Sequence, residues 1–326
     1  MRPVGDRGAR IAPLTAGPRT GPRRAAQGSA LLLAGLLCGA CAVAPETAPA
    51  GGAPRPISVD ALADAMARRP VVLLGEVHDN AAQHAVRFQA LQRLLARGAR
   101  PAIAFEQFDR DRQEAIDRIR RDDRGDVGAR ADHIIADAGA KGWDWTLYRP
   151  YLVLALERDL PIVAANLSRT QAMRVATEGV AAVFDGPQRA ALGLDSVAPD
   201  IEKSQEYEIA LGHCGQLPPD SLPAMAGAQI ARDAMLAQSI APYFARGVVL
   251  LTGNGHARRD IGVLRHIAPQ DQGRVVSIGL LEDDDKAAAR AGYFDVSFLT
   301  PVQTRADPCA NFPHTPMNAQ PGAGTI

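Results

Sequence analysis

The stretch VVLLGEVHDN, at residues 71–80, joins an apolar run to a cluster of polar side chains. Four apolar residues run into Gly75 and are followed at once by Glu76, His78 and Asp79. A continuous apolar run is typical of a strand buried on both faces, as in parallel sheets. The sequence therefore predicts a buried strand whose carboxyl end opens onto a polar site.

Five further apolar runs alternate with amphipathic stretches along the chain. They are PAIAFEQF (101–108), LPIVAANL (160–167), GVVLLTGNG (247–255), RVVSIGLL (274–281) and DVSFLT (295–300). Strands that alternate with helical segments predict an α/β fold with a mostly parallel central sheet flanked by helices. Residues 177–245 break this alternation, and we interpret them as a helical insertion that contains two helices.

The segment after the opening stretch predicts an amphipathic helix. One face carries four residues at i, i+4, i+7 and i+11: His84, Phe88, Leu91 and Leu95. Arg87, Gln92 and Arg93 are assigned to other parts of the helix surface. Asn80 followed by Gln83 is typical of a helix cap.

The first 40 residues have the pattern of an export signal, in which a basic segment precedes a short apolar one. SALLLAGLLCGAC at residues 29–41 is too short to span a bilayer. Gly39 and Ala40 before Cys41 resemble a bacterial lipoprotein signal, in which the cysteine is acylated. Secretion without a lipid is the alternative.

The composition divides the rest of the chain into three parts. Residues 41–56 are rich in Pro, Ala and Gly, which predicts a flexible tether. Residues 57–303 are expected to form a single α/β domain. Residues 304–326 contain four prolines and are expected to form a loose carboxyl-terminal tail.

Charge and cysteine content limit the possible partners and compartments. Without residues 1–40 the chain has 30 basic and 35 acidic residues, so nucleic acid is a poor candidate partner. After Cys41 only Cys214 and Cys309 are present, an even number that suits an oxidising compartment. They form either a disulfide or two buried thiols.

Polar residues follow the apolar runs, and the carboxyl ends of parallel strands meet at one edge of a sheet. We therefore expect a pocket there, with six main candidates: Glu76, His78, His84, Glu106, Asn254 and His256. A carboxylate as close to a core as Glu106 needs a cation, a metal or a hydrogen-bond donor. Asp79 and Asn80 are more typical of helix caps, and His84 fits either the core or the pocket.

GWDWTLYRPY, at residues 142–151, gathers both tryptophans and two tyrosines in ten residues. The tryptophans could be core anchors, which is their commoner use. Alternatively they form an aromatic wall for a flat ligand, with Tyr148 or Tyr151 offering an oxygen.

The motifs in their order along the chain resemble the ChaN family of haem-binding lipoproteins, within the wider Tiki, TraB and erythromycin-esterase superfamily. The resemblance runs from about residue 57 to 312 and is carried by GEVHDN (75–80), FEQF (105–108), GWDWTLYRPY, LPIVAANLSR (160–169), GHC (212–214), AQIARDAML (228–236), GNGHARRDIGV (253–263) and DPCANF (307–312).

This resemblance implies non-covalent haem binding in the bacterial cell envelope, in connection with iron uptake, with haem held at a contact between two protomers. It implies a tyrosine as iron ligand, for which we choose Tyr148, with Tyr151 and His213 as the next candidates. Arg149, Arg232 or Arg258 would neutralise the propionates. A lipid anchor in the membrane and an outer-membrane haem receptor are the implied partners.

The alternative is a metal-dependent hydrolase, because related members of the superfamily cleave peptides or esters. Its ligands or general base would be Glu76, His78, Glu106 and His256, holding zinc or manganese with an open water position. The chain lacks an H-E-x-x-H motif, so the fold alone would have to bring these residues together.

Overall fold

The computed structural model describes residues 54–307 and 309–310, so the predicted signal, Cys41 and most of the tether lie outside the described residues. The described part contains a seven-stranded sheet of order β1-β7-β6-β2-β5-β3-β4, with all neighbouring strands parallel. Its strands are β1 (Arg55–Pro56), β2 (Val71–Leu74), β3 (Ala102–Asp109), β4 (Ile162–Asn166), β5 (Val248–Leu251), β6 (Val275–Glu282) and β7 (Val296–Thr300). The predicted parallel α/β architecture is confirmed.

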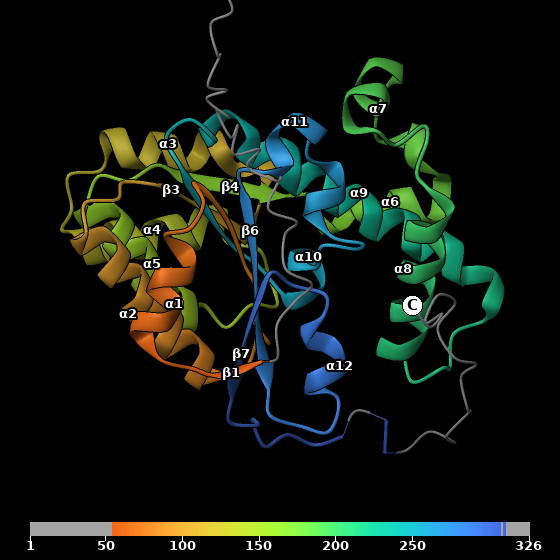
Figure 1. The fold of residues 1–326 in the computed structure, drawn as a ribbon. Helices are drawn as coiled ribbons and strands as arrows, with labels where there is room; N and C mark the ends of the chain where they lie inside the picture. Colours follow the sequence, from red (N-terminus) through yellow and green to blue (C-terminus); the bar gives the residue numbers. More distant parts are fainter. Residues whose placement is uncertain (1–53, 308, 311–326) are drawn as a thin grey trace, which may run out of the picture. The chain divides into compact units, whose positions relative to one another are not determined.

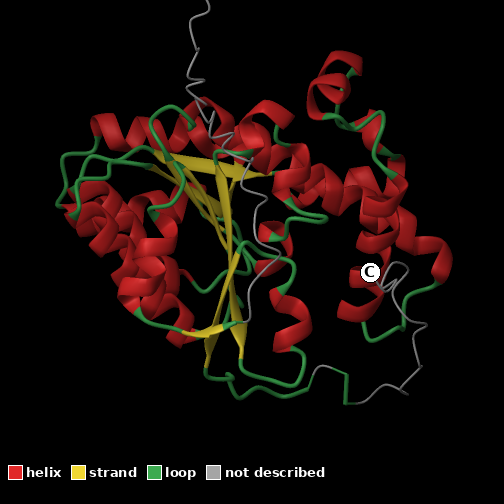
Figure 2. Cartoon of the chain, viewed as in Figure 1, coloured by secondary structure: helices red, strands yellow, loops and turns green. Residues whose placement is uncertain are grey.

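Helices pack on both faces of this sheet. The α-helices among the described residues are α1 (Val59–Met66), α2 (Ala81–Ala96), α3 (Gln113–Asp122), α4 (Val127–Ala138), α5 (Trp145–Glu157), α6 (Arg169–Glu178), α7 (Gly186–Leu192), α8 (Pro199–Gly212), α9 (Leu222–Ile240), α10 (Asn254–Ala257), α11 (Pro269–Gln272) and α12 (Ala287–Ala291). Figure 1 shows α1, α2, α4 and α5 on one side of the sheet, and α9, α10 and α12 on the other. In Figure 2 the strands form one twisted layer between them.

The alternation of side chains along each strand builds two separate apolar cores. On β2, Val72 and Leu74 pack with α1 to α5, whereas Val71 and Leu73 pack with α9, α10 and the chain around Phe294. Successive side chains of a strand point to opposite faces, so a strand covered on both faces must be apolar throughout. This explains why the strands could be recognised as unbroken apolar runs.

Helix α2 begins as predicted and differs from the prediction at one residue. The Asn80 side chain accepts a hydrogen bond from the Gln83 backbone N–H at 3.1 Å, which caps the helix. Arg87, assigned above to another part of the surface, is fully buried. Its position three residues after His84 places both on the same face of the helix.

Two features differ from the predictions: the number of helices in the insertion and the length of the tether. Residues 177–245 are helical as expected, but α7, α8 and α9 give three α-helices there rather than two, because Asp185 and Gly193 cap a short helix between them. The predicted tether is also too long: Arg55 and Pro56 form the edge strand β1, which pairs with β7. Proline is tolerated at a sheet edge, where its missing N–H leaves no central ladder bond unmade.

Candidate functional site

A cavity of about 1260 Å³ lies at the carboxyl edge of the sheet, between the strand-end loops and the helical insertion. Of the twelve residues predicted for the pocket or for haem, nine line this cavity: Glu76, His78, Glu106, Tyr148, His213, Arg232, Asn254, His256 and Arg258. The other three, His84, Arg149 and Tyr151, are not part of its lining. The convergence expected at the ends of the strands is therefore present.

Glu76 is the centre of a buried cluster at the end of β2. Its Oε1 accepts a hydrogen bond from the Tyr148 hydroxyl at 2.5 Å and lies 3.1 Å from His78 Nδ1. Its Oε2 lies 3.2 Å from His84 Nε2 and contacts the Arg87 guanidinium. The carboxylate thus has two cavity-lining partners on one oxygen and two core partners on the other.

Tyr148 lies on α5 and lines the cavity, although only 1% of the residue is exposed. Burial raises the pKa of its phenol well above the usual value, so the hydroxyl keeps its proton in the ligand-free protein. The rings of His84, Trp143 and Trp145 surround it edge-on, with ring centroids 4.9, 5.7 and 6.1 Å away. The hydroxyl is therefore held in one position by its acceptor and by three neighbouring rings.

The two tryptophans of this segment have different roles. Trp143 lines the cavity and lies 4.7 Å from the His78 ring, centroid to centroid. Trp145 packs against the apolar core, and its indole N–H donates to the carbonyl of Ala140 at 3.2 Å. The sequence left two roles open for the tryptophans. Trp143 lies in the cavity wall, and Trp145 is a core anchor.

Two residues predicted for the site lie in the core instead. Tyr151 is 1% exposed, and its hydroxyl donates to the carbonyl of His84 at 2.9 Å. His84 is itself buried behind Glu76, and its Nε2–H donates to the carbonyl of His78 at 3.0 Å. The structure therefore places both residues in the core and not in the cavity lining, which differs from the pocket and haem positions expected for them.

A second polar cluster is built around His256, in the short helix α10. Its Nδ1 lies 2.7 Å from Asp233 Oδ1, and its Nε2 lies 3.5 Å from Glu106 Oε1. The other Glu106 oxygen accepts from the Thr252 hydroxyl at 2.7 Å and the Gly253 N–H at 2.8 Å. Burial alone lowers the pKa of an imidazole, but the two carboxylates outweigh it and raise the pKa of His256 to about 10. At neutral pH this histidine is a cation between two acidic side chains.

Raising the pH from about 6.5 to about 10 is expected to reduce the free energy of unfolding through His256. A group whose pKa is higher in the folded chain stabilises the fold fully below the unfolded value, and this contribution is lost as the pH rises through the folded value. For His256 these values are 6.5 and about 10. Urea unfolding at several pH values measures the slope. His256→Gln is expected to flatten it, and an unchanged slope in that variant would contradict the prediction.

Two glycines permit the close approach of backbone and site residues at this edge. A Cβ on Gly253 would lie 2.8 Å from His78 Cε1, and a Cβ on Gly75 would lie 2.4 Å from Asn254 Oδ1. Both separations are far below van der Waals contact. Any larger residue at either position would displace His78 or Asn254.

The arginines predicted to hold propionates differ in their availability. Arg149 pairs with Asp132 on the surface and does not line the cavity, unlike the position expected for it. Arg258 lines the cavity but already donates to Glu208 and Asp260 at 2.5 to 2.9 Å. Its charge is therefore largely neutralised by this chain's own carboxylates.

Other cations of the cavity are less engaged. Arg232 donates to the Asn166 amide oxygen at 3.0 Å, and burial lowers its pKa. Three further cationic residues line the cavity and form no ion pair with the described part of the chain: Lys141, Arg169 and Lys286. No motif in the sequence singled them out, because basic residues, nearly all of them arginines, occur throughout the chain.

His213, at the end of α8, faces the cavity in a defined state. Its Nδ1 lies 2.8 Å from the Ile209 carbonyl, an acceptor only, so Nδ1 carries the proton. In the neutral ring, Nε2 then keeps its lone pair, which is the arrangement of a histidine able to bind a metal.

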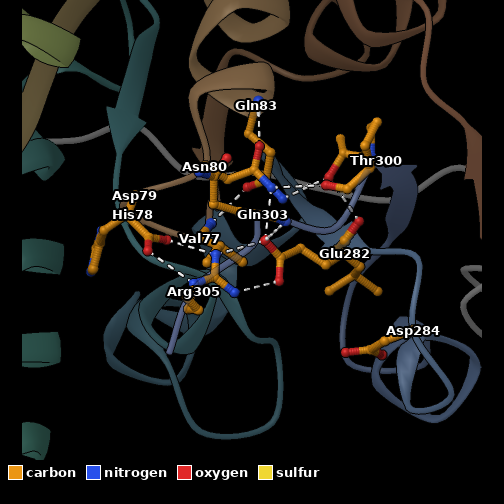
Figure 3. Close-up of polar contacts among 12 residues, drawn as sticks. Val77, His78, Asp79, Asn80, Gln83, Glu282, Asp284, Thr300, Gln303 and Arg305 are labelled. Carbon is orange, nitrogen blue, oxygen red and sulfur yellow. Dashed lines mark hydrogen bonds and ion pairs between the residues drawn. The ribbon is translucent and has the colours of Figure 1, made fainter. Parts of the chain in front are cut away.

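Chain segments far apart in sequence are joined at the rim of this edge. Figure 3 shows Arg305 between Asp79 and Glu282, to which its guanidinium donates at 2.8 to 2.9 Å. Glu282 also accepts from the Asn80 amide at 2.8 Å. The Arg305 hydrogen bond is the main reason that the pKa of Glu282 falls to about 2.

The described part of the predicted loose tail is therefore not loose. Besides the Arg305 contacts, Cys309 forms a disulfide with Cys214, with 5.6 Å between their Cα atoms. Of the two states open from the sequence, the structure has the disulfide. It ties residues beyond β7 to the end of α8, next to His213.

A family comparison decides where this chain belongs. The model described as "Haem-binding uptake, Tiki superfamily, ChaN" matches residues 62–267. The chain belongs to the ChaN family. Among solved structures it is similar to ChaN of Campylobacter jejuni, which shows cofacial haem binding, with 20% identity and a TM-score of 0.58 over 74% of this chain and 91% of that chain. An erythromycin esterase mutant, EreC in its open conformation, has 13% identity and a TM-score of 0.37 over 68% and 71%. No curated protein matched.

The metal-dependent alternative is not supported in this ChaN family member. Within residues 54–307 and 309–310, no group of three or more His, Cys, Asp or Glu side chains is arranged to hold a metal ion. Glu76 is occupied by Arg87 and Tyr148, and His256 carries a proton between Asp233 and Glu106.

Among residues 54–307 and 309–310, none of the helices has the length and apolar character that a membrane span requires.

Proposed function

We propose that this ChaN family chain binds haem non-covalently in its cavity, with Tyr148 as the ligand of ferric iron. The observation that carries the proposal is Tyr148 itself, which lines the cavity and whose hydroxyl donates to the buried Glu76 carboxylate. The family description and the cofacial haem binding of the Campylobacter jejuni relative support haem as the bound molecule.

The residues of the cavity suit haem in three respects. A volume of about 1260 Å³ exceeds the roughly 300–1,000 Å³ of most small-molecule pockets. Trp143 and His78 contribute two aromatic rings to the lining. Lys141, Arg169 and Lys286 supply positive charge for carboxylates. When bound, haem would supply a ferric iron that accepts an anionic oxygen ligand.

Glu76 gives Tyr148 a path for its proton. A phenol must lose its proton to act as an anionic ligand, and burial disfavours the phenolate in the ligand-free protein. The carboxylate oxygen 2.5 Å away already accepts that proton in a hydrogen bond. Glu76 Oε1 is therefore the first proton acceptor.

We further propose an exported lipoprotein of the bacterial cell envelope that takes part in haem or iron uptake. Cys41 would be acylated, and haem would lie at the contact of a homodimer that exchanges haem with an outer-membrane receptor. The support is the lipoprotein-like pattern at residues 29–41 and the uptake role in the family description. Incorporation of labelled palmitate into the wild type, and its absence from Cys41→Ala, would test the anchor.

Titration with hemin tests the haem proposal directly. The purified full chain is expected to give a saturable spectrum with a tyrosinate-to-iron charge-transfer band. Tyr148→Phe is expected to lose the band and to bind about tenfold more weakly or worse, since each 1.4 kcal/mol of lost binding is tenfold.

Tyr151→Phe is the matched control, because Tyr151 lies on the same helix but away from the cavity. It should keep the band and the affinity. A wild type without a saturable spectrum would reject haem binding, whereas an unchanged spectrum in Tyr148→Phe would reject only this ligand.

A further inference from the structure

Arg87 is a buried cation that does not line the cavity. Haem binding by Tyr148 does not by itself account for it. Arg87 lies on the second turn of α2, with 0% of its side chain exposed. Its guanidinium contacts Glu76 Oε2, and its second terminal nitrogen donates to the carbonyl of Leu74 at 3.2 Å. Burying a guanidinium is costly unless it is paired, so the position of Arg87 depends on Glu76.

Glu76 in turn divides its two oxygens between the core and the cavity. Oε2 faces Arg87 and His84, whereas Oε1 faces Tyr148 and His78. The guanidinium fork spans two groups: one terminal nitrogen contacts Glu76 Oε2, and the other donates to the carbonyl of Leu74 at the end of β2. The planar fork therefore places the cation beside Oε2 at a position set by the strand backbone, which leaves Oε1 toward the Tyr148 hydroxyl.

We propose that Arg87 is a positioning residue which, through Glu76, fixes the oxygen and the charge next to the Tyr148 hydroxyl. This inference rests on the proposed function in one respect, that Tyr148 is the iron ligand. Without Arg87 the Glu76 side chain would lose its anchor, and an uncompensated negative charge would lie beside the phenol oxygen. Residues that hold a metal ligand through a hydrogen bond typically affect metal affinity about 10–100-fold.

Arg87→Lys tests this role, because lysine keeps the charge but lacks the fork. The variant is expected to bind hemin about 10–100-fold more weakly than the wild type and to shift the tyrosinate-to-iron band. The control is Arg93→Lys on the exposed side of the same helix, where Arg93 pairs with Asp60. It should change neither quantity.

A readout without haem separates this inference from the proposed function. In the ligand-free protein, the Tyr148 hydroxyl proton, assigned through its loss in Tyr148→Phe, is expected downfield in proton NMR spectra. Arg87→Lys should displace this resonance, and Arg93→Lys should not. If the resonance is unchanged in Arg87→Lys, the inference is overturned, whether or not hemin uses Tyr148. If it moves but Tyr148→Phe binds hemin normally, Arg87 positions Tyr148 and the ligand assignment is the part that fails.

The double variant Glu76→Gln/Arg87→Met covers the case in which Arg87→Lys does not fold. It removes both charges and keeps an amide oxygen as acceptor for Tyr148. Glu76→Gln alone is the reference, because the change of acceptor by itself displaces the hydroxyl resonance. A folded double variant whose resonance differs from that of Glu76→Gln supports the positioning role, and one with the same resonance and hemin affinity as Glu76→Gln overturns it.

Discussion

Glu76→Gln alone is expected to lower the free energy of unfolding by about 3–5 kcal/mol, which is the cost of breaking a buried ion pair from one side. The substitution leaves the Arg87 guanidinium fully buried without its carboxylate. The Tyr148 hydroxyl can still donate to the amide oxygen, so the loss comes from the unpaired charge. Urea unfolding measures the difference, and for a domain of this size each kcal/mol corresponds to roughly 2–4 °C in Tm.

The double variant Glu76→Gln/Arg87→Met provides the control, because replacing both members of a buried ion pair is often close to neutral. It should be more stable than Glu76→Gln alone, although it carries one more substitution. If the double variant is instead less stable by the sum of two independent losses, the ion pair is not the source of the effect.

The sheet could be predicted because its physical basis is visible in single segments. A strand covered on both faces has an unbroken apolar run, as Val71 to Leu74 illustrates. β1 escaped the prediction since two residues, one of them Pro56, carry no periodic signal. Its pairing with β7 depends on chain segments about 240 residues apart, as Arg55 and Phe298 show.

The location of the site could be predicted from the sequence, but the contacts between its residues could not. The ends of parallel strands meet at one edge whatever their side chains, so Glu76, Glu106 and His256 were expected together. Arg87 was missed because a helix face defined by apolar residues excludes a basic one. Two signals pointed to it: its i+3 spacing from His84, and the need of a buried Glu76 for a cation.

Neighbours of Tyr148 show why adjacency in sequence misleads on a helix. With 3.6 residues per turn, Arg149 is rotated by about 100° from Tyr148 and pairs with Asp132 at the surface. Tyr151 returns near the same side but one turn further along α5, where its hydroxyl meets the His84 carbonyl. Only the docking of α5 against α2 determines which of the two tyrosines reaches the cavity.

Removing the Cys214–Cys309 disulfide is expected to lower the free energy of unfolding by up to about 4.7 kcal/mol. The two cysteines are 95 residues apart, so the bond closes a long loop in the unfolded chain and restricts its conformations. The Arg305 contacts remain without the disulfide, but they act only in the folded chain. They cannot replace the covalent restriction of the unfolded chain.

Urea unfolding with and without a thiol reductant measures this contribution, and Cys214→Ser/Cys309→Ser is the matched variant. Reduced wild type and the double serine variant should unfold at the same, lower urea concentration, and the reductant should not affect the variant. The loss acts mainly on the unfolded chain, so the native contacts of Arg305 with Asp79 and Glu282 should persist. A wild-type midpoint that does not change on complete reduction would mean that the fold holds residue 309 beside α8 without the bond.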